Sequence, residues 1–327
     1  MPHGSPASRR ALLAAFAAMG LTRSARAQAW PSRPIRMIVA FGAGSGSDIR
    51  ARVIGDRLAV DLGQPVVIDN RGGANGFLAA EAVARARPDG YTLLFTSNST
   101  HAANPALFRR LPYDPIADFE PVAMVGETPL IIVVNNDLPV HDLAGLVAYA
   151  KRQPGGLNYA SGNTSSRVGA EMFKIATGID MTYVSYRSNA QGITDVIAGN
   201  PQVMFSDASV GIPQVREGRV RAIGITGKQP VRALPGVPTV EAALGLPDFA
   251  IHSWSAVFAP AGTPAEIVAK LNAGIRDILN QPEIRTRMEE EGTEVPPLDP
   301  AGVGRFVVAE IAKWRRVVAQ AGIEVAP

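Results

Sequence analysis

A loop of small residues directly follows the first strongly apolar segment of the chain. It reads Phe41-Gly42-Ala43-Gly44-Ser45-Gly46-Ser47-Asp48 and precedes a segment with helical periodicity. Small side chains let backbone N–H groups approach a ligand closely, and a helix N-terminus favours a negative charge. The loop therefore has the composition of an anion-binding site, although a glycine-rich turn without a ligand explains the same residues equally well.

Polar residues also follow three later segments that have the pattern of strands. Each of them alone fits a capped helix start or a solvated loop better than a binding site. In an open α/β sheet, however, ligands bind outside the carboxyl ends of the strands. Four such ends together predict a cleft lined by hydroxyl, amide and N–H groups, which suits a small carboxylate. The three further ends are Thr96-Ser97-Asn98-Ser99-Thr100, 161–166 and Ser206-Asp207.

Three aromatic residues are candidates for the apolar walls of this cleft. They are Tyr183, Tyr186 and Trp254. Packing in the core is the alternative for each of them, and it is the expectation for Tyr183.

The sequence excludes several kinds of cofactor and metal site. Ser47 takes the place of the third glycine of a dinucleotide-binding fingerprint, Asp48 would repel a pyrophosphate, and no Lys-Ser/Thr pair follows the loop. The chain has no cysteine, which excludes thiolate metal sites and a cysteine nucleophile. Its histidines beyond residue 30 have no spacing typical of a shared metal site; they are His101, His141 and His252. We therefore expect no cofactor and no metal.

Catalysis has little support in the sequence. A triad of Ser97, His101 and Asp207 can be drawn, but the serines lack the flanking residues of a nucleophile elbow. Structural or capping roles are the expectation for the histidines, and Glu289-Glu290-Glu291 is interpreted as the solvated face of a helix. We expect that the protein is not an enzyme. An exported hydrolase acting on a carboxylate derivative in the same cleft is the alternative.

The first 27 residues have the composition of an export signal. The apolar run 11–21 is too short to span a bilayer, and Ala25-Arg26-Ala27 fits a cleavage site. We predict a signal peptide over 1–27, cleaved near Ala27, and a periplasmic mature protein. Ser8-Arg9-Arg10 partly matches a twin-arginine signal, which leaves the export route open.

The leader also accounts for the basic character of the chain. In the full sequence 32 Lys and Arg face 29 Asp and Glu. The leader holds no acid and contains Arg9, Arg10, Arg23 and Arg26, so its removal leaves 28 bases against 29 acids. A net charge of −1 argues against nucleic-acid binding, because such binding depends on clustered positive charge.

The elements that must position these loops alternate between strand and helix patterns. Short apolar runs followed by amphipathic segments predict β-α-β-α-β units with a parallel sheet. Asp48 is expected to cap the first helix, and Gly63 to end it. The predicted strands are 35–41, 65–69, 91–96, 129–135, 158–161, 181–186, 202–205, 220–226 and 252–259. The predicted helices are 48–62, 77–87, 166–177, 190–198, 264–280, 282–291 and 301–321.

Two long apolar strands divide the pattern into two halves of similar architecture. The chain would cross between the halves at about 128–136 and 250–258. We therefore predict an α/β fold of two lobes, each a mostly parallel sheet flanked by helices. The first lobe would comprise 28–128 and 253–327, and the second 129–252.

Short motifs spread along the chain resemble those of one protein family. Besides the first glycine loop they are Asp69-Asn70-Arg71, Pro88-Asp89-Gly90-Tyr91-Thr92-Leu93-Leu94, Leu111-Pro112-Tyr113-Asp114-Pro115, Leu157-Asn158-Tyr159-Ala160-Ser161-Gly162 and Ala259-Pro260-Ala261-Gly262-Thr263-Pro264. On these motifs the chain resembles the extracytoplasmic solute receptors of the tripartite tricarboxylate transporter family, often called Bug-type receptors. The resemblance implies a two-lobed, type II periplasmic-binding-protein-like fold that closes on a ligand. It also implies delivery of that ligand to membrane permease subunits.

The resemblance further implies which residues hold the ligand. In such receptors the first glycine loop and the loop corresponding to 161–166 bind a carboxylate through backbone amides, hydroxyls and water. Asp207 would meet an ammonium or hydroxyl group of the ligand, or would only hold its own loop. Carried over by position, the ligand-binding residues are Ala43, Gly44, Ser45, Ser97, Ser99, Asn163, Thr164, Ser165 and Asp207.

Two positions depart from the pattern of the family. Gly44-Ser45 stands where paired glycines are usual, and Arg167 stands where a histidine is usual. Arg167 would pair with a second carboxylate or face solvent, and the sequence leaves both interpretations open. We expect a monomer that binds a small organic carboxylate and no nucleic acid. A receptor that presents its closed form to a membrane kinase is the alternative to a transport role.

Overall fold

One continuous sheet joins the early and late parts of the chain. The computed structural model describes Met1 and residues 30–153, 156–247, 249–320 and 322–326. These residues form a nine-stranded sheet in the order β2-β1-β3-β9-β4-β7-β5-β6, with β8 also paired to β4. The strands are β1 (Ile35–Val39), β2 (Val66–Asn70), β3 (Thr92–Ser97), β4 (Phe119–Asn135), β5 (Asn158–Ser161), β6 (Thr182–Ser185), β7 (Val203–Asp207), β8 (Val220–Ile225) and β9 (His252–Pro260).

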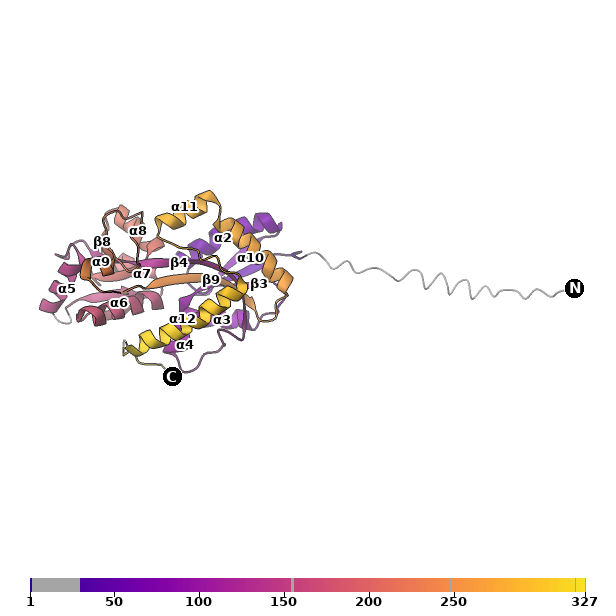
Figure 1. Cartoon of the computed structure of the whole chain (residues 1–327), viewed down its shortest axis with the longest axis horizontal. Coiled ribbons are helices and arrows are strands. Elements are labelled where there is room, and N and C mark those ends of the chain that lie inside the picture. Colours follow the sequence, from indigo (N-terminus) through magenta and orange to yellow (C-terminus); the bar gives the residue numbers. More distant parts are fainter. Residues whose placement is uncertain (2–29, 154–155, 248, 321, 327) are drawn as a thin grey trace.

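Helices cover both faces of the sheet. In Figure 1, α2, α10 and α11 lie on one side of the strands, and α3, α4 and α12 lie on the other. The α-helices are α2 (Gly46–Leu62), α3 (Phe77–Ala84), α4 (Asn104–Leu107), α5 (Leu143–Arg152), α6 (Thr164–Thr177), α7 (Asn189–Ile197), α8 (Ala208–Arg216), α9 (Val240–Leu244), α10 (Ala265–Leu279), α11 (Pro282–Glu290) and α12 (Pro300–Gln320). Two short turns, η1 (Ala74–Gly76) and η2 (Ser99–Ala103), complete the set.

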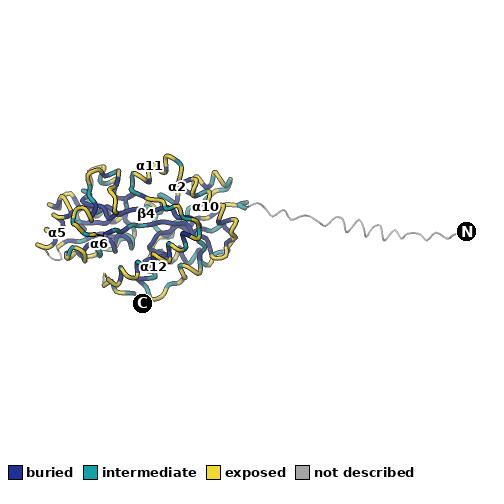
Figure 2. Tube along the Cα trace, in the orientation of Figure 1, coloured by how far each residue is buried: buried dark blue, intermediate teal, exposed yellow. Residues whose placement is uncertain are grey.

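The first strand shows how the sequence specifies this layering. Successive side chains of a strand point to opposite faces of the sheet. Met37 and Val39 of β1 pack with Leu58 of α2 in one core cluster, whereas Ile38 packs in another with Val83 of α3. The four apolar side chains of β1 are buried and Arg36 is exposed, which explains why β1 reads as an apolar run with a single arginine. Figure 2 shows the same arrangement as buried strands between helices that are exposed on their outer faces.

The long strand β4 connects two groups of strands. Its residues 119–129 pair antiparallel with β9, and its residues 130–135 pair antiparallel with β7 and β8. The sequence predicted a strand over 129–135 only, whereas β4 begins ten residues earlier, at Phe119. The register shifts next to Pro121, and such irregularities are places where a strand accommodates proline.

The outer strands confirm the parallel arrangement predicted from the sequence. The pairs β1·β2, β1·β3, β5·β6 and β5·β7 are parallel. The antiparallel pairs all involve β4 or β9, the two strands by which the chain leaves one group of strands and returns to it. The helices predicted at 264–280, 282–291 and 301–321 correspond to α10, α11 and α12.

The predicted signal peptide, 1–27, lies outside the described residues apart from Met1. Within the part of the chain that the structure describes, no helix is both long enough and apolar enough to cross a bilayer.

Candidate functional site

A cavity lies where the ends of several strands meet the two long strands β4 and β9. It encloses about 600 Å³, including its opening to solvent. Ser45, Ser97, Asn163 and Asp207, which the sequence singled out, all line it. We call it the first cavity; its other polar lining residues are Ser47, Arg50, Thr128, Arg187, Ser188, Asn189, Ser209, Ser253 and Ser255.

The start of α2 presents backbone donors to the first cavity. Ser45 is the N-cap of this helix, and its hydroxyl accepts a hydrogen bond from the N–H of Asp48 (3.2 Å). The first-turn N–H groups of an α-helix have no partner within the helix, and the cap satisfies only that of Asp48. Gly46 and Ser47, which line the cavity, therefore retain N–H groups that can donate hydrogen bonds to an anion.

Asp48 is not the helix cap that the sequence predicted. Its carboxylate accepts a hydrogen bond from the N–H of Gly44 (2.9 Å) and forms an ion pair with Arg52 (2.9 Å). Burial alone would raise the pKa of Asp48, but these two contacts outweigh it and hold the pKa below the usual value. Ser45 takes the cap because it precedes the first helical residue, whereas Asp48 lies within the first turn.

Ala43 and Gly44 lie beside the first cavity rather than in its lining. Both are exposed, and the N–H of Gly44 is already bonded to Asp48. Gly44 has a φ of +78°, a conformation that favours glycine. Gly44 thus shapes the turn that leads into α2, and the donors that face the cavity come from the next residues along the chain.

The opposite wall of the cavity is built around Asp207. The Asn163 side chain caps α6 by accepting from the N–H of Ser166 (2.9 Å), and its amide donates to both carboxylate oxygens of Asp207 (3.0 and 3.2 Å). Asn189 donates to the same carboxylate (2.9 Å). Burial raises the pKa of Asp207, while these amides and the positive charge of Arg50 offset part of the rise. The carboxylate therefore holds the two loops in position.

The residue after β3, Asn98, links α6 and β9 beside the first cavity. Asn98 is fully buried, and its side-chain oxygen accepts hydrogen bonds from the hydroxyls of Ser165 (2.9 Å) and Ser253 (3.4 Å). The hydroxyl of Ser97 accepts from the N–H of Ser99 (3.2 Å). Ser165 thus acts as a link between α6 and the end of β3, whereas Ser99 and Thr164 line a neighbouring cavity.

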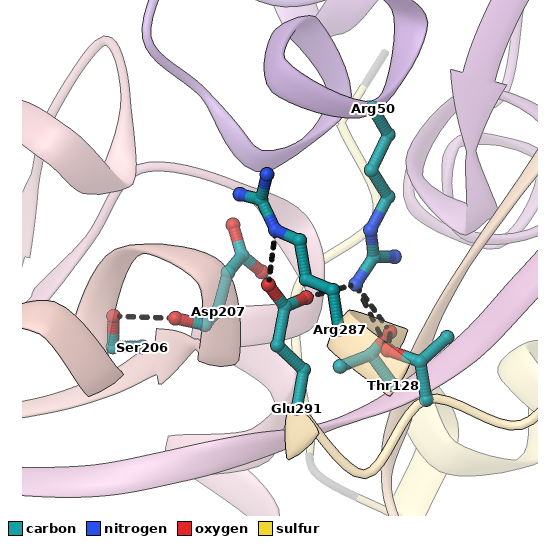
Figure 3. A network of polar contacts seen from close by, with 7 residues as sticks. Arg50, Thr128, Ser206, Asp207, Arg287 and Glu291 are labelled. Carbon is teal, nitrogen blue, oxygen red and sulfur yellow. Dashed lines mark hydrogen bonds and ion pairs between the residues drawn. The ribbon is translucent and has the colours of Figure 1, made fainter. Parts of the chain in front are cut away.

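Arg50 is a polar residue of the site that the sequence reasoning missed. Its guanidinium donates to Thr128 (2.8 Å), Thr293 (3.0 Å) and Glu291 (3.1 Å), as Figure 3 shows for the labelled partners. Arg287 also contacts Glu291 (3.4 Å). A signal was present, because Arg50 lies four residues after Gly46 and so on the same face of α2.

Glu291 differs from its predicted role as part of a solvated acidic face. Its side chain is only 13% exposed, because it pairs with Arg50 across α2 and the end of α11. Asn189, Thr128 and Ser209 were missed as well. They come from segments without an unusual local sequence, and only the fold brings them to the cavity.

The three residues of the possible catalytic triad do not bond to one another. His101 is completely buried, its Nδ1 lies 2.8 Å from the Thr100 hydroxyl, and its ring stacks on Phe258. Burial lowers the pKa of His101 to about 3, so the ring is neutral at physiological pH. The Asp207 carboxylate is bonded to Asn163 and Asn189 instead. Within the described residues no group of His, Asp and Glu is arranged to hold a metal ion.

The aromatic candidates have different positions. Trp254 lines the first cavity and is otherwise buried; its indole N–H donates to Glu310 (2.9 Å) and its ring packs against Phe306. Tyr183, expected in the core, is 36% exposed and lies under the guanidinium of Arg167. That expectation was wrong because β6 is the edge strand of the sheet and has one open side.

Comparisons with known proteins agree with this geometry. The family described as "Tripartite tricarboxylate transporter family receptor" matches residues 50–323. BugT of Bordetella pertussis is 33% identical, over 94% of this chain and 95% of its own. The solved structure "R. palustris Rpa4515 with adipate" has a TM-score of 0.86 and 34% identity, covering 90% of this chain and 99% of that one.

A second solved structure, "MatC (Rpa3494) from Rhodopseudomonas palustris with bound malate", gives a TM-score of 0.82 at 35% identity. It covers 88% of this chain and 100% of its own. The fold is therefore that of a periplasmic binding protein, as the sequence predicted. By the extent of the family match and the identity with its relatives, the chain belongs to the tripartite tricarboxylate transporter receptor family.

Proposed function

We propose that this protein binds a small organic carboxylate in the first cavity and releases it chemically unchanged. The observation that carries the proposal is the pairing of two polar walls. One wall has the first-turn N–H groups of α2 and the guanidinium of Arg50. The other has the guanidinium of Arg187 and the hydroxyl of Ser188, beside the loops that the amides of Asn163 and Asn189 hold to Asp207. Backbone N–H, amide and guanidinium donors are the groups that carboxylates accept from.

The cavity would open and close by movement of two lobes. We assign residues 28–128 and 253–327 to the first lobe and 129–252 to the second. The pairing of β4 supports this division, because it changes partners between Pro129 and Leu130. The chain leaves the first lobe through β4 and returns to it through β9, so the hinge would lie at these two crossings.

The predicted site residues take three roles in this proposal. Ser45, Ser97, Asn163 and Asp207 would surround the ligand in the first cavity. Ser99 and Thr164 would face the adjoining cavity. Ala43, Gly44 and Ser165 would shape the loops without direct contact, since the Gly44 N–H and the Ser165 hydroxyl already have partners in the protein.

Family membership supports a periplasmic location and permease subunits as the partner that receives the ligand. Two of the solved relatives are described with adipate and with malate, which supports a carboxylate as the ligand class. Cross-linking of the ligand-loaded protein to permease subunits, rather than to a sensor ectodomain, would separate delivery from a sensing role.

The experiment is a thermal-shift screen of the mature chain over mono-, di- and tricarboxylates, followed by calorimetry. An acid at a hundred times its dissociation constant stabilises the folded state by about 2.7 kcal/mol. For a chain of this length that corresponds to a rise in Tm of about 4 °C. NMR of the recovered ligand should show it unaltered. No response to any acid would contradict the proposal, and conversion of the acid would favour the hydrolase.

Two helix caps provide a matched pair of variants for this screen. Asn163 caps α6 at the cavity, and Asp142 caps α5 away from it by accepting from the N–H of Gly145 (2.6 Å). Replacing either residue with alanine should cost about 1 kcal/mol of stability. Only Asn163→Ala should also weaken ligand binding, by about tenfold or more, because it leaves the Asp207 carboxylate in the cavity wall without the amide that holds it. Equal affinities of the two variants would remove Asn163 from the site.

A further inference from the structure

A second cavity adjoins the first one. It encloses about 1220 Å³, including its opening to solvent. Phe41, Gly162, Asn163 and Arg187 line both cavities, so the two spaces meet at these residues. A ligand held in the first cavity can therefore extend past Asn163 into the second.

The second cavity contains two guanidinium groups. Arg167 lies on α6 and Arg187 follows β6, and neither forms an ion pair with any residue that the structure describes. Glu324 is the acidic residue of the lining, and it is exposed at the rim. The interior of this cavity therefore has an excess of positive charge, which attracts an anion.

Arg167 is held in a fixed orientation with a donor still free. Its guanidinium lies 4.7 Å from the centre of the Tyr183 ring, an arrangement in which cation and ring attract each other. Its Nε is buried and has no hydrogen-bond partner in the protein. A planar guanidinium fixed by stacking is prepared for two parallel hydrogen bonds to a carboxylate.

A buried hydroxyl points to the same conclusion independently. Ser99 is 2% exposed, lines the second cavity, and has a hydroxyl without a hydrogen-bond partner. Buried polar groups are rarely left unpaired in folded proteins, because removing them from water without a partner costs free energy. Ser99 and Arg167 belong to different elements, η2 and α6, and both face this cavity.

We propose that the second cavity receives a distal anionic group of the ligand, and that Arg167 is the residue that selects for it. This inference rests on the proposed function, in which the first cavity holds the proximal carboxylate. The preferred ligands are then elongated molecules with an anion at each end, such as straight-chain dicarboxylates. Monocarboxylates of the same length fill the first cavity but leave Arg167 without a partner.

The test compares two series of probes by calorimetry: dicarboxylates from succinate to suberate, and the monocarboxylates of equal length from butyrate to octanoate. The wild-type protein should bind its best dicarboxylate at least about tenfold more tightly than the matching monocarboxylate, as expected for a charge-assisted hydrogen bond. Arg167→Gln should abolish this preference by weakening only the dicarboxylate. Arg167→Lys keeps the charge without the planar fork and should retain part of the preference.

Arg33 provides the matched control. Its guanidinium also lies over a tyrosine ring, that of Tyr91 at 3.9 Å, but Arg33 lines neither cavity and pairs with Asp89. Arg33→Gln should leave both affinities within about twofold of the wild type.

The outcomes separate the two proposals. Equal affinity of the wild type for both series, or equal losses on both series in Arg167→Gln, overturns the role of Arg167 while the carboxylate-binding function stands. If Arg167→Gln does not fold, the preference of the wild type and its reduction in Arg167→Lys decide the question. Failure of every probe to bind the wild-type protein overturns the proposed function and this inference together.

Discussion

Two ion pairs between the same pair of helices offer a direct test of how burial determines their contribution to stability. Arg50 of α2 pairs with Glu291 at the end of α11 at 3.1 Å, and Arg57 of α2 pairs with Glu283 of α11 at 3.0 Å. The side chains of the first pair are 17% and 13% exposed, and those of the second are 51% and 58% exposed. The residue types and distances match, so burial is the main difference.

The expected magnitudes follow from this difference. Arg50→Met removes hydrogen bonds to Glu291, Thr128 and Thr293, and it leaves a partly buried carboxylate with the weaker contact to Arg287. Hydrogen bonds to charged groups contribute about 1.5–3 kcal/mol, so we expect a loss of about 2 kcal/mol in the free energy of unfolding. Exposed pairs contribute about 0.2–1 kcal/mol, so Arg57→Met should cost about 0.5 kcal/mol or less.

Urea unfolding of both variants at the same salt concentration measures these losses. The double variant Arg50→Met with Glu291→Gln should show a coupling energy of about 1 kcal/mol or more, since the two residues are in contact. Raising the salt concentration should reduce the effect of Arg57→Met more than that of Arg50→Met. Equal losses in the two single variants would refute the reasoning that burial of the first pair strengthens it.

Other variants test the loops and the buried ionisable groups. Gly162→Ala should impair folding and binding, because a Cβ would lie 2.0 Å from the carbonyl carbon of Ser188; circular dichroism and calorimetry measure both. Gly44→Ala, with open space but a positive φ, should cost only about 1 kcal/mol in urea unfolding. Because the pKa of Asp48 is lowered in the folded state, its ionised carboxylate stabilises the fold above pH 3.8. This stabilisation is lost as the pH falls through the pKa of the folded state. The loss of unfolding free energy caused by Asp48→Asn should therefore be smaller in acid than at pH 7. His101 has a pKa of about 3 in the folded protein and of about 6.5 in the unfolded chain, so folding keeps its ring neutral. The free energy of unfolding should therefore fall as the pH drops from 6.5 towards 3, and it should fall less steeply in His101→Leu.

The fold was predictable because periodicity reports burial directly. A strand buried on both faces is apolar at nearly every position, as in β1, where Arg36 is the exposed exception. Helices such as α10 bury one stripe and expose the other. The end of α2 at Gly63 was also predictable, because glycine readily adopts the left-handed conformation that often ends a helix. The full length of β4 was not predictable, because Pro121 lies next to a register irregularity that only the pairing with β9 defines.

The candidate site was predictable only where a single segment carried the signal. Ser45, Ser97, Asn163 and Asp207 follow or end strands, and the structure brings all four to one cavity. The hydrogen bonds among them were not predictable, because Asp207 meets Asn163 and Asn189 across gaps of 44 and 18 residues. Arg50 and Glu291 are 241 residues apart, and no local pattern connects them.

The glycine loop shows that the place of a loop in the fold can be predicted from sequence while the partners of its N–H groups cannot. Small residues at 42–47 predicted an anion site, and the structure does place this segment beside the cavity. The carboxylate of Asp48, four residues further on, however, accepts the N–H of Gly44. Because the Asp48 carboxylate occupies the N–H of Gly44, a ligand carboxylate cannot accept from it. The N–H groups left for a ligand are those of Gly46 and Ser47, which line the cavity. Asp48→Asn should therefore loosen the turn without creating a new anion contact, and a gain in carboxylate affinity in that variant would contradict this account.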